Sequence, residues 1–400
     1  MVGAQHPRAQ GRQWFLSEST WAADAINGRR LALLRADPTT RPDAHGVLVI
    51  DEHGDRKWGH KTAQVGRQYL ANLGKTDSGV VAVTSLWADA RVYYPLDYEP
   101  YTPKHHCAKG QADAAFRTKL PIAGELVAAA VAAGVPFRAV VADSFYGEDA
   151  GFCQRLHALR VGHVLALKPA HGWWHQAGTS GTLKEAAAAA GWREPLHPGA
   201  WVRVVRIFRD GHSETWWALE VVAGPYGPAP GLRAVVATTD PATLPDHQSW
   251  YLATNLPTAD EQLRAAGALP PADLAEVVRL YGLRMWVEQS DKQTKYALGW
   301  SQYQVRSDQA MRRHWQLVCC AFSCCWWHDS HPSPPDAHHE AQPAADEAAG
   351  WGGNTRPSPA GVLAGGAARR ARLAGAVAHA PALLAQLVAA APAARVVVSA

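Results

Sequence analysis

Residues 280–295 read Leu-Tyr-Gly-Leu-Arg-Met-Trp-Val-Glu-Gln-Ser-Asp-Lys-Gln-Thr-Lys. Four side chains that can bind a phosphate or a metal recur in this stretch at helical spacing: Tyr281, Arg284, Glu288 and Lys295. The spacing predicts one helix that carries all four on one face and turns its apolar positions to a core. A solvated face would explain the same pattern, because an Arg284–Glu288 pair at i,i+4 contributes only ~0.3–0.5 kcal/mol.

Two distant aspartates favour a functional site over a solvated face. Asp51 follows the apolar run 47–50, and Asp143 follows the apolar run 137–142. Each run is typical of a strand buried on both faces, and acids at the carboxyl ends of such strands lie where open α/β sheets bind ligands. Either aspartate alone could be a helix cap or a turn residue. Together with Glu288, they indicate a carboxylate triad.

These motifs resemble those of the DDE transposases of cut-and-paste bacterial insertion sequences. The stretch 281–295 matches their Y-x2-R-x3-E-x6-K signature, the segment Asp143-Ser-Phe-Tyr-Gly resembles their second-aspartate motif, and 49–59 resembles their first-aspartate block. The resemblance extends from about residue 45 to 328. One departure is His53, two residues after the first aspartate, where such proteins commonly carry Thr.

The resemblance implies an α/β fold of the ribonuclease H-like type, a mixed sheet flanked by helices. A β-rich insertion would separate the second aspartate from the Glu288 helix. The expected order of elements agrees: strands at 47–50, 79–87 and 90–94, a helix near 112–133, and strands at 137–142 and 163–168. The expected units are an N-terminal helical segment at 1–44, a catalytic domain at 45–169 and 259–328, the insertion at 170–258, and a Pro- and Ala-rich linker with a helical tail at 329–400.

The activity that the resemblance implies is metal-dependent DNA cleavage and strand transfer at the inverted-repeat ends of an insertion sequence. Asp51, Asp143 and Glu288 would hold two Mg²⁺ ions, with Mn²⁺ able to substitute. The residues expected to contact DNA are Tyr281, Arg284, Lys295, Trp286, Arg306, Arg312 and Arg313. For Trp286 the alternative is a place in the core, and for the last three arginines it is a solvated surface.

The implied partners are double-stranded DNA, as transposon ends and as target, and a second copy of the chain in a synaptic homodimer. The alternative function is that of a domesticated or degenerate relative, which acts only as a nuclease or a DNA-binding protein. The presence of all three acids and of Lys295 argues against decay.

Composition and charge agree with an enzyme of the bacterial cytoplasm. The 400 residues are 48% hydrophobic and can bury a sizeable core. The sequence has neither a run of eighteen apolar residues nor an apolar N-terminal segment, which argues against a membrane span and against secretion. Two adjacent cysteine pairs form a poor pattern for disulfides. We therefore expect a cytoplasmic, nucleoid-associated protein with no membrane partner; the net charge of +4 is compatible with DNA binding.

Overall fold

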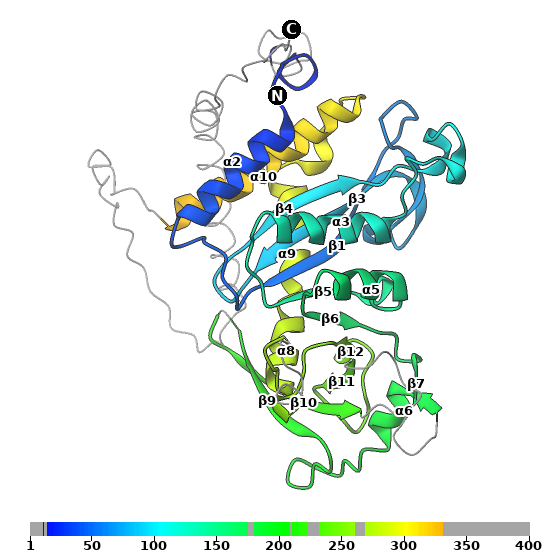
Figure 1. The fold of residues 1–400 in the computed structure, drawn as a ribbon, viewed down its shortest axis with the longest axis vertical. Coiled ribbons are helices and arrows are strands. Elements are labelled where there is room, and N and C mark those ends of the chain that lie inside the picture. The colour runs from blue at the N-terminus through cyan, green and yellow to red at the C-terminus, as the bar shows by residue number, and fades with distance from the viewer. Residues whose placement is uncertain are drawn as a thin grey trace, which may run out of the picture.

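A ten-stranded mixed sheet runs through the computed structural model of the protein (Figure 1). The structure describes residues 11, 14–174, 180–208, 210–221, 232–260 and 269–330, so the predicted tail lies outside the described residues from position 331 onward. The strands of the sheet are β1 (Val47–Arg56), β2 (Gly66–Leu70), β3 (Lys75–Ala88), β4 (Tyr93–Pro100), β5 (Ala139–Ala142), β6 (His163–Ala166), β9 (Val202–Ile207), β10 (Ser213–Val221), β11 (Arg233–Thr238) and β12 (Ser249–Thr254). A separate hairpin is formed by β7 (Gly172–Trp174) and β8 (Ser180–Thr182).

The first half of the sheet has the ribonuclease H-like arrangement. Its strands lie in the order β4-β3-β1-β5-β6, in which β3 is antiparallel to its neighbours β1 and β4, and β5 is parallel to β1 and β6. The predicted three-strand meander and the two following strands are therefore confirmed. The prediction had no counterpart of β2, which pairs with the first residues of β3.

The register between β1 and β5 brings the two aspartates together. Positions 47, 48 and 49 pair with 139, 140 and 141, and the same offset places Asp51 level with Asp143. The prediction that the first strand ends at Asp51 is wrong, because β1 continues along β3 as far as Arg56. Its parallel partner β5 stops at Ala142, so Asp51 still stands at the end of the parallel pairing.

Helices cover both faces of this half of the sheet. The α-helices of the described residues are α2 (Ala23–Ala36), α3 (Lys119–Ala132), α4 (Ser144–Gly147), α5 (Ala150–Ala158), α6 (Leu183–Ala188), α8 (Leu274–Gly282), α9 (Met285–Lys292) and α10 (Asp308–Ser330), of which α6 packs on the insertion half of the sheet instead. Side chains alternate along β1, so that Glu52 reaches Lys119 of α3 whereas His53 reaches Asp291 of α9. The helices α3 and α9 therefore lie on opposite faces (Figure 1). No helix among the described residues combines the length and apolarity needed to cross a bilayer.

The predicted insertion strands continue the central sheet. Next to β6 come β12, β11, β10 and β9 in turn, each antiparallel to its neighbour. Within the insertion, the alternating or apolar runs at 201–208, 215–222 and 232–238 predict β9, β10 and β11, although residues 222–231 lie outside the described residues. The sequence predicts that 250–255 returns the chain to the core, and this segment forms β12. A second apolar cluster covers one face of this half, formed mainly by α6, Trp201 and the strands β10 to β12.

The Glu288 segment is not the single helix that the spacing predicts. α8 ends at Gly282, α9 begins at Met285, and a π-helix, η4 (Gln293–Ala297), follows. Around the break the backbone N–H groups of Arg284 and Val287 donate three residues back, to Tyr281 and Arg284. A Cβ on Gly282 would lie only 2.6 Å from the Arg206 guanidinium, so a larger residue there would require the Arg206 side chain to move.

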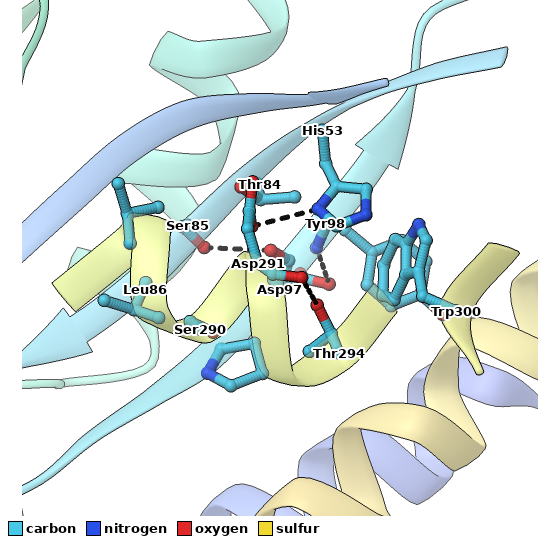
Figure 2. A pocket seen from close by; sticks show the side chains of 12 residues that line it. His53, Thr84, Ser85, Leu86, Asp97, Tyr98, Ser290, Asp291, Thr294 and Trp300 are labelled. Carbon is cyan, nitrogen blue, oxygen red and sulfur yellow. Dashed lines mark hydrogen bonds and ion pairs between the residues drawn. The ribbon is translucent and has the colours of Figure 1, made fainter. Parts of the chain in front are cut away.

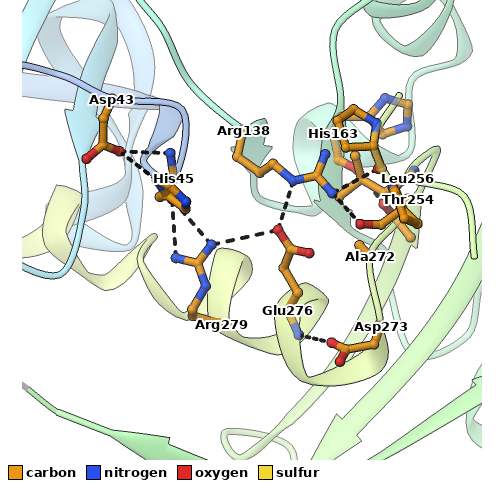
Figure 3. A network of polar contacts seen from close by, with 12 residues as sticks. Asp43, His45, Arg138, His163, Thr254, Leu256, Ala272, Asp273, Glu276 and Arg279 are labelled. Carbon is orange, nitrogen blue, oxygen red and sulfur yellow. Dashed lines mark hydrogen bonds and ion pairs between the residues drawn. The ribbon is translucent and has the colours of Figure 1, made fainter. Parts of the chain in front are cut away.

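A polar network ties α8 to the starts of the two strands that carry the aspartates (Figure 3). Arg138, just before β5, donates to Glu276 of α8 at 2.8 Å and to the carbonyl oxygens of Pro270 and Pro271 at 2.9 Å. Arg279 of α8 donates to the carbonyl oxygen of His45, just before β1. The helix that leads to Arg284 is thereby fixed against β1 and β5.

Candidate active site

Asp51 and Asp143 converge on the guanidinium of Arg284. Arg284 Nη2 lies 2.7 Å from Asp51 Oδ2 and 4.0 Å from Asp143 Oδ2. The two acids come from neighbouring parallel strands, and the arginine comes from the break between α8 and α9. The structure therefore unites three of the predicted site residues from segments more than 90 positions apart in the sequence.

Burial sets the charge state of Asp51. It raises the pKa of this carboxyl from 3.8 to about 7, because the lowering effect of Arg284 is offset by desolvation and by the neighbouring charge of Asp143. Only a fifth of the Asp51 side chain is exposed. A further cation beside this desolvated carboxylate would strongly stabilise its charged form.

Asp143 also caps α4, which was the alternative reading of this residue. Its Oδ1 accepts the backbone N–H of Phe145 at 3.0 Å, while its Oδ2 faces Arg284. The same motif supplies Tyr146, whose buried hydroxyl has no hydrogen-bond partner among the described residues, and Gly147, where a Cβ would collide with the carbonyl oxygen of Ala166. The motif thus combines a cap, a site carboxylate and a close contact between α4 and β6.

Glu288 lies apart from the two aspartates. Its side chain is exposed on α9, although its charge acts on both Arg284 and Tyr281. Within the part of the chain that the structure describes, no three His, Cys, Asp or Glu side chains stand close enough together to hold an ion. The structure therefore brings Asp51 and Asp143 together and leaves Glu288 at the edge of the site.

Tyr281 and Lys295 lie in the chain on either side of α9, and Tyr281 is the one coupled electrostatically to Arg284 and both aspartates. Burial raises the pKa of Tyr281 to about 12, so its hydroxyl is protonated and can donate a hydrogen bond. Its ring lies edge-on to Trp250, with ring centroids 5.0 Å apart. Lys295 is half-buried within the π-helix.

Trp286 lies against the core. Its ring stacks on that of Tyr93 at 4.6 Å, with only 13° between the ring planes, and it packs at the margin of the main apolar cluster. This placement favours the alternative that the sequence left open for Trp286, an anchor for α9, over a contact with a nucleobase.

The other three predicted DNA contacts, Arg306, Arg312 and Arg313, differ in exposure and in the groups that they already bind. Arg306 is exposed. Arg312 is held by Glu99 at 2.7 and 3.0 Å and by Asp308 at 2.7 Å. Arg313 is 2% exposed and donates to three backbone carbonyls of residues 16–21. Arg313 therefore fastens the N-terminal segment to α10, and we do not retain it among the candidate DNA contacts.

Glu52 and Lys119 border the site but were missed in the sequence. Glu52 follows Asp51 on the opposite face of β1 and pairs with Lys119 Nζ at 2.5 Å. Burial raises the pKa of Glu52, an effect that Lys119 counters. Glu52 stands inside the first-aspartate block, but its partner lies 67 positions away, so no local pattern could identify the pair.

The two aspartates offer donors that suit a divalent metal. Asp51 and Asp143 already share a cationic group, since the Arg284 guanidinium faces both. Carboxylate oxygens are the ligands that hard divalent ions prefer. Endonucleases of the DDE superfamily use divalent metal ions, and the two aspartates, with Glu288 on the adjacent helix, are the residues of this chain that could hold them.

Two sequence comparisons agree with this interpretation. The profile of the DDE superfamily endonuclease family matches residues 4–199. Over 297 residues the chain is 34% identical to the "Probable transposase for insertion sequence element IS701" of Microchaete diplosiphon. The matched region covers 74% of this chain and 68% of that relative. Among solved structures, the piggyBac transposase in a synaptic complex with hairpin DNA matches with a TM-score of 0.40 at 10% identity, over 88% of this chain and 55% of that one.

Proposed function

The chain belongs to the DDE transposases of bacterial insertion sequences, and we propose that it cleaves and rejoins DNA at its element's inverted-repeat ends through Asp51, Asp143 and Glu288. The observation that carries the proposal is the register of β1 and β5, which sets the two aspartates level with each other and facing one cation. A decayed relative would be free to lose any of these acids or Lys295, and the chain retains them all. The nuclease-only or DNA-binding alternative is therefore not favoured.

The metal in this proposal is Mg²⁺, as two ions, with Mn²⁺ able to substitute. Asp51, Asp143 and Glu288 would hold the ions through their carboxylate oxygens. When bound, the ions supply stabilisation of the charge that develops on the attacking and leaving oxygens of a phosphodiester. Mg²⁺ suits this site because its potential ligands are carboxylates and because it retains water molecules.

The other side chains of the site would bind and orient DNA. Arg284 offers a planar fork for a phosphate, Lys295 offers a point charge, and protonated Tyr281 offers a hydrogen-bond donor. Arg306 is exposed and could follow the backbone beyond the site. Arg312 is a weaker candidate, since Glu99 and Asp308 already neutralise it.

The organisation that we propose keeps the predicted units. The catalytic domain comprises 45–169 and 259–328, and the insertion at 170–258 adds strands and surface beside it. Two copies would act together on double-stranded ends and target DNA, since each element has two ends to be joined. Such an enzyme would work in the bacterial cytoplasm, at the nucleoid.

The experiment that tests the proposal uses a duplex carrying the inverted repeats that flank the coding region. With Mg²⁺ or Mn²⁺, the purified protein should nick this duplex at the repeat boundary and leave a 3′-hydroxyl, whereas a duplex with shuffled repeats or a reaction with EDTA should give no product. Cleavage that persists in EDTA, or that ignores the repeats, would contradict the proposal.

A further inference from the structure

One face of β1 contacts the chain between Arg284 and Ser301 through three side chains at alternate positions. Asp51, His53 and Asp55 stand at every second position of the strand, so their side chains point to the same face. Asp51 contacts Arg284 at 2.7 Å, and His53 Nδ1 lies 2.9 Å from Asp291 Oδ1. Asp55 Oδ1 accepts a hydrogen bond from Ser301 Oγ at 2.5 Å. The contacts follow the same order along both segments, which fixes the register of the segment against the strand.

The His53–Asp291 contact is buried. His53 is 3% exposed, and its second nitrogen, Nε2, has no hydrogen-bond partner among the described residues. Figure 2 shows both side chains at a small cavity between β1, β4 and the Glu288 segment. Its volume of about 20 Å³ is enough for one water molecule.

A buried polar contact of this kind is a poor source of stability. Removing an imidazole and a carboxylate from water costs free energy that their mutual contact only partly returns, and well-packed apolar residues often serve as well or better. Such a contact is explained more readily by the placement that it enforces than by the free energy of unfolding.

The residues that need placement lie on both sides of Asp291. Glu288 precedes it by one helical turn, and Lys295 follows it in the π-helix. Thr294 Oγ1 donates to the carbonyl oxygen of Asp291 at 3.1 Å, within the turn that carries Lys295. Single π-helical turns are rare and occur often at functional sites, and the contact of Asp291 with His53 lies just before this one.

We propose that His53 and Asp291 are a positioning pair, which fixes Glu288 and Lys295 relative to Asp51 on the same strand. The inference rests on the proposed function, since it concerns the geometry of that site. Neither residue touches the reacting atoms; both act through the segment that they anchor. A displacement of ~1 Å in such a site can slow a reaction about a hundredfold.

The test compares His53→Leu with a matched control, His163→Leu. His163 is also 3% exposed, lies on a buried strand of the same sheet and has no hydrogen-bond partner for its ring among the described residues. We expect His53→Leu to weaken Mn²⁺ binding to the DNA-free protein roughly tenfold, measured by electron paramagnetic resonance, and to slow end nicking by 10–100-fold. His163→Leu should leave both unchanged.

Two substitutions at Asp291 test whether a side chain that keeps the hydrogen bond to His53 also keeps the function. Asp291→Asn keeps an oxygen that can accept from His53, so its Mn²⁺ affinity and nicking rate should stay within about threefold of the wild type, whereas Asp291→Leu should match His53→Leu. The double variant should be no worse than either single one, because both remove the same contact.

The outcomes separate the inference from the proposed function. If the wild type binds Mn²⁺ and nicks ends while His53→Leu equals His163→Leu, the positioning pair is refuted and the function stands. If the wild type neither binds Mn²⁺ nor nicks, the proposed function fails, and the inference falls with it.

Discussion

At the scale of single residues, the chemistry concentrates on Asp51. Its carboxylate is desolvated, faces Arg284, and stands level with Asp143. The acid was predictable from the apolar run before it. Its raised pKa was not, because the burial that raises it comes from segments distant in sequence.

The first prediction concerns the proton on Asp51. Because its pKa is about 7, Asp51 is largely protonated below that pH, and a metal ion must displace the proton to bind. The apparent Mn²⁺ affinity should therefore fall about tenfold for each pH unit below 7 and level off above it. Titrations between pH 5.5 and 8 measure this, and a constant affinity down to pH 5.5 would contradict it.

A second prediction concerns Lys295. If Lys295 contacts a phosphate, Lys295→Ala should weaken binding to cleaved ends and reduce the salt dependence of binding by about one phosphate contact. The matched control is Lys292→Ala, an exposed lysine of the same segment, which should change the slope less. An equal salt dependence of DNA binding for the two variants would indicate that Lys295 lies on a solvated face and does not contact a phosphate.

At the scale of elements, the sequence predicts strands better than the Glu288 helix. The strands were recognisable because buried apolar runs and turn residues are local signals. At 283–284 the N–H groups of Arg284 and Val287 donate three residues back, a local tightening that the spacing of side chains does not predict. The buried place of Arg313 likewise depends on carbonyls nearly 300 positions away.

The third prediction concerns the anchoring of α9 by Trp286. Because its ring stacks on Tyr93 and packs at the edge of the core, Trp286→Ala should lower the free energy of unfolding by about 2–4 kcal/mol. It should slow the first nick and the later steps alike. Trp58→Ala serves as control for stability, since Trp58 is 83% exposed. Selective slowing of a step after nicking, with an unchanged melting temperature, would instead place Trp286 against a nucleobase.

At the scale of the whole molecule, one continuous sheet joins the catalytic half to the insertion. Alternating or apolar runs predict β9, β10 and β11, but the pairing of β12 with β6 is a contact between distant segments that no local pattern encodes. The ribonuclease H-like order of the first half was predictable because the family resemblance supplied the topology. The position of Glu288 relative to the aspartates depends on how the two segments pack, and the sequence alone does not determine it.

The central claim is that this sheet assembles Asp51 and Asp143, with Glu288, into a metal-dependent centre for DNA cleavage. The most direct measurement compares the rate of Mg²⁺-dependent end nicking by Asp143→Asn and by Asp149→Asn. Both aspartates cap a helix, Asp143 at α4 and Asp149 at α5, and the amide oxygen of Asn can keep the capping hydrogen bond in each variant. We expect Asp143→Asn to bind end DNA and nick it at least about a hundredfold more slowly, with Asp149→Asn near the wild type. Nicking by Asp143→Asn at the wild-type rate, with full dependence on Mg²⁺, would contradict the claim.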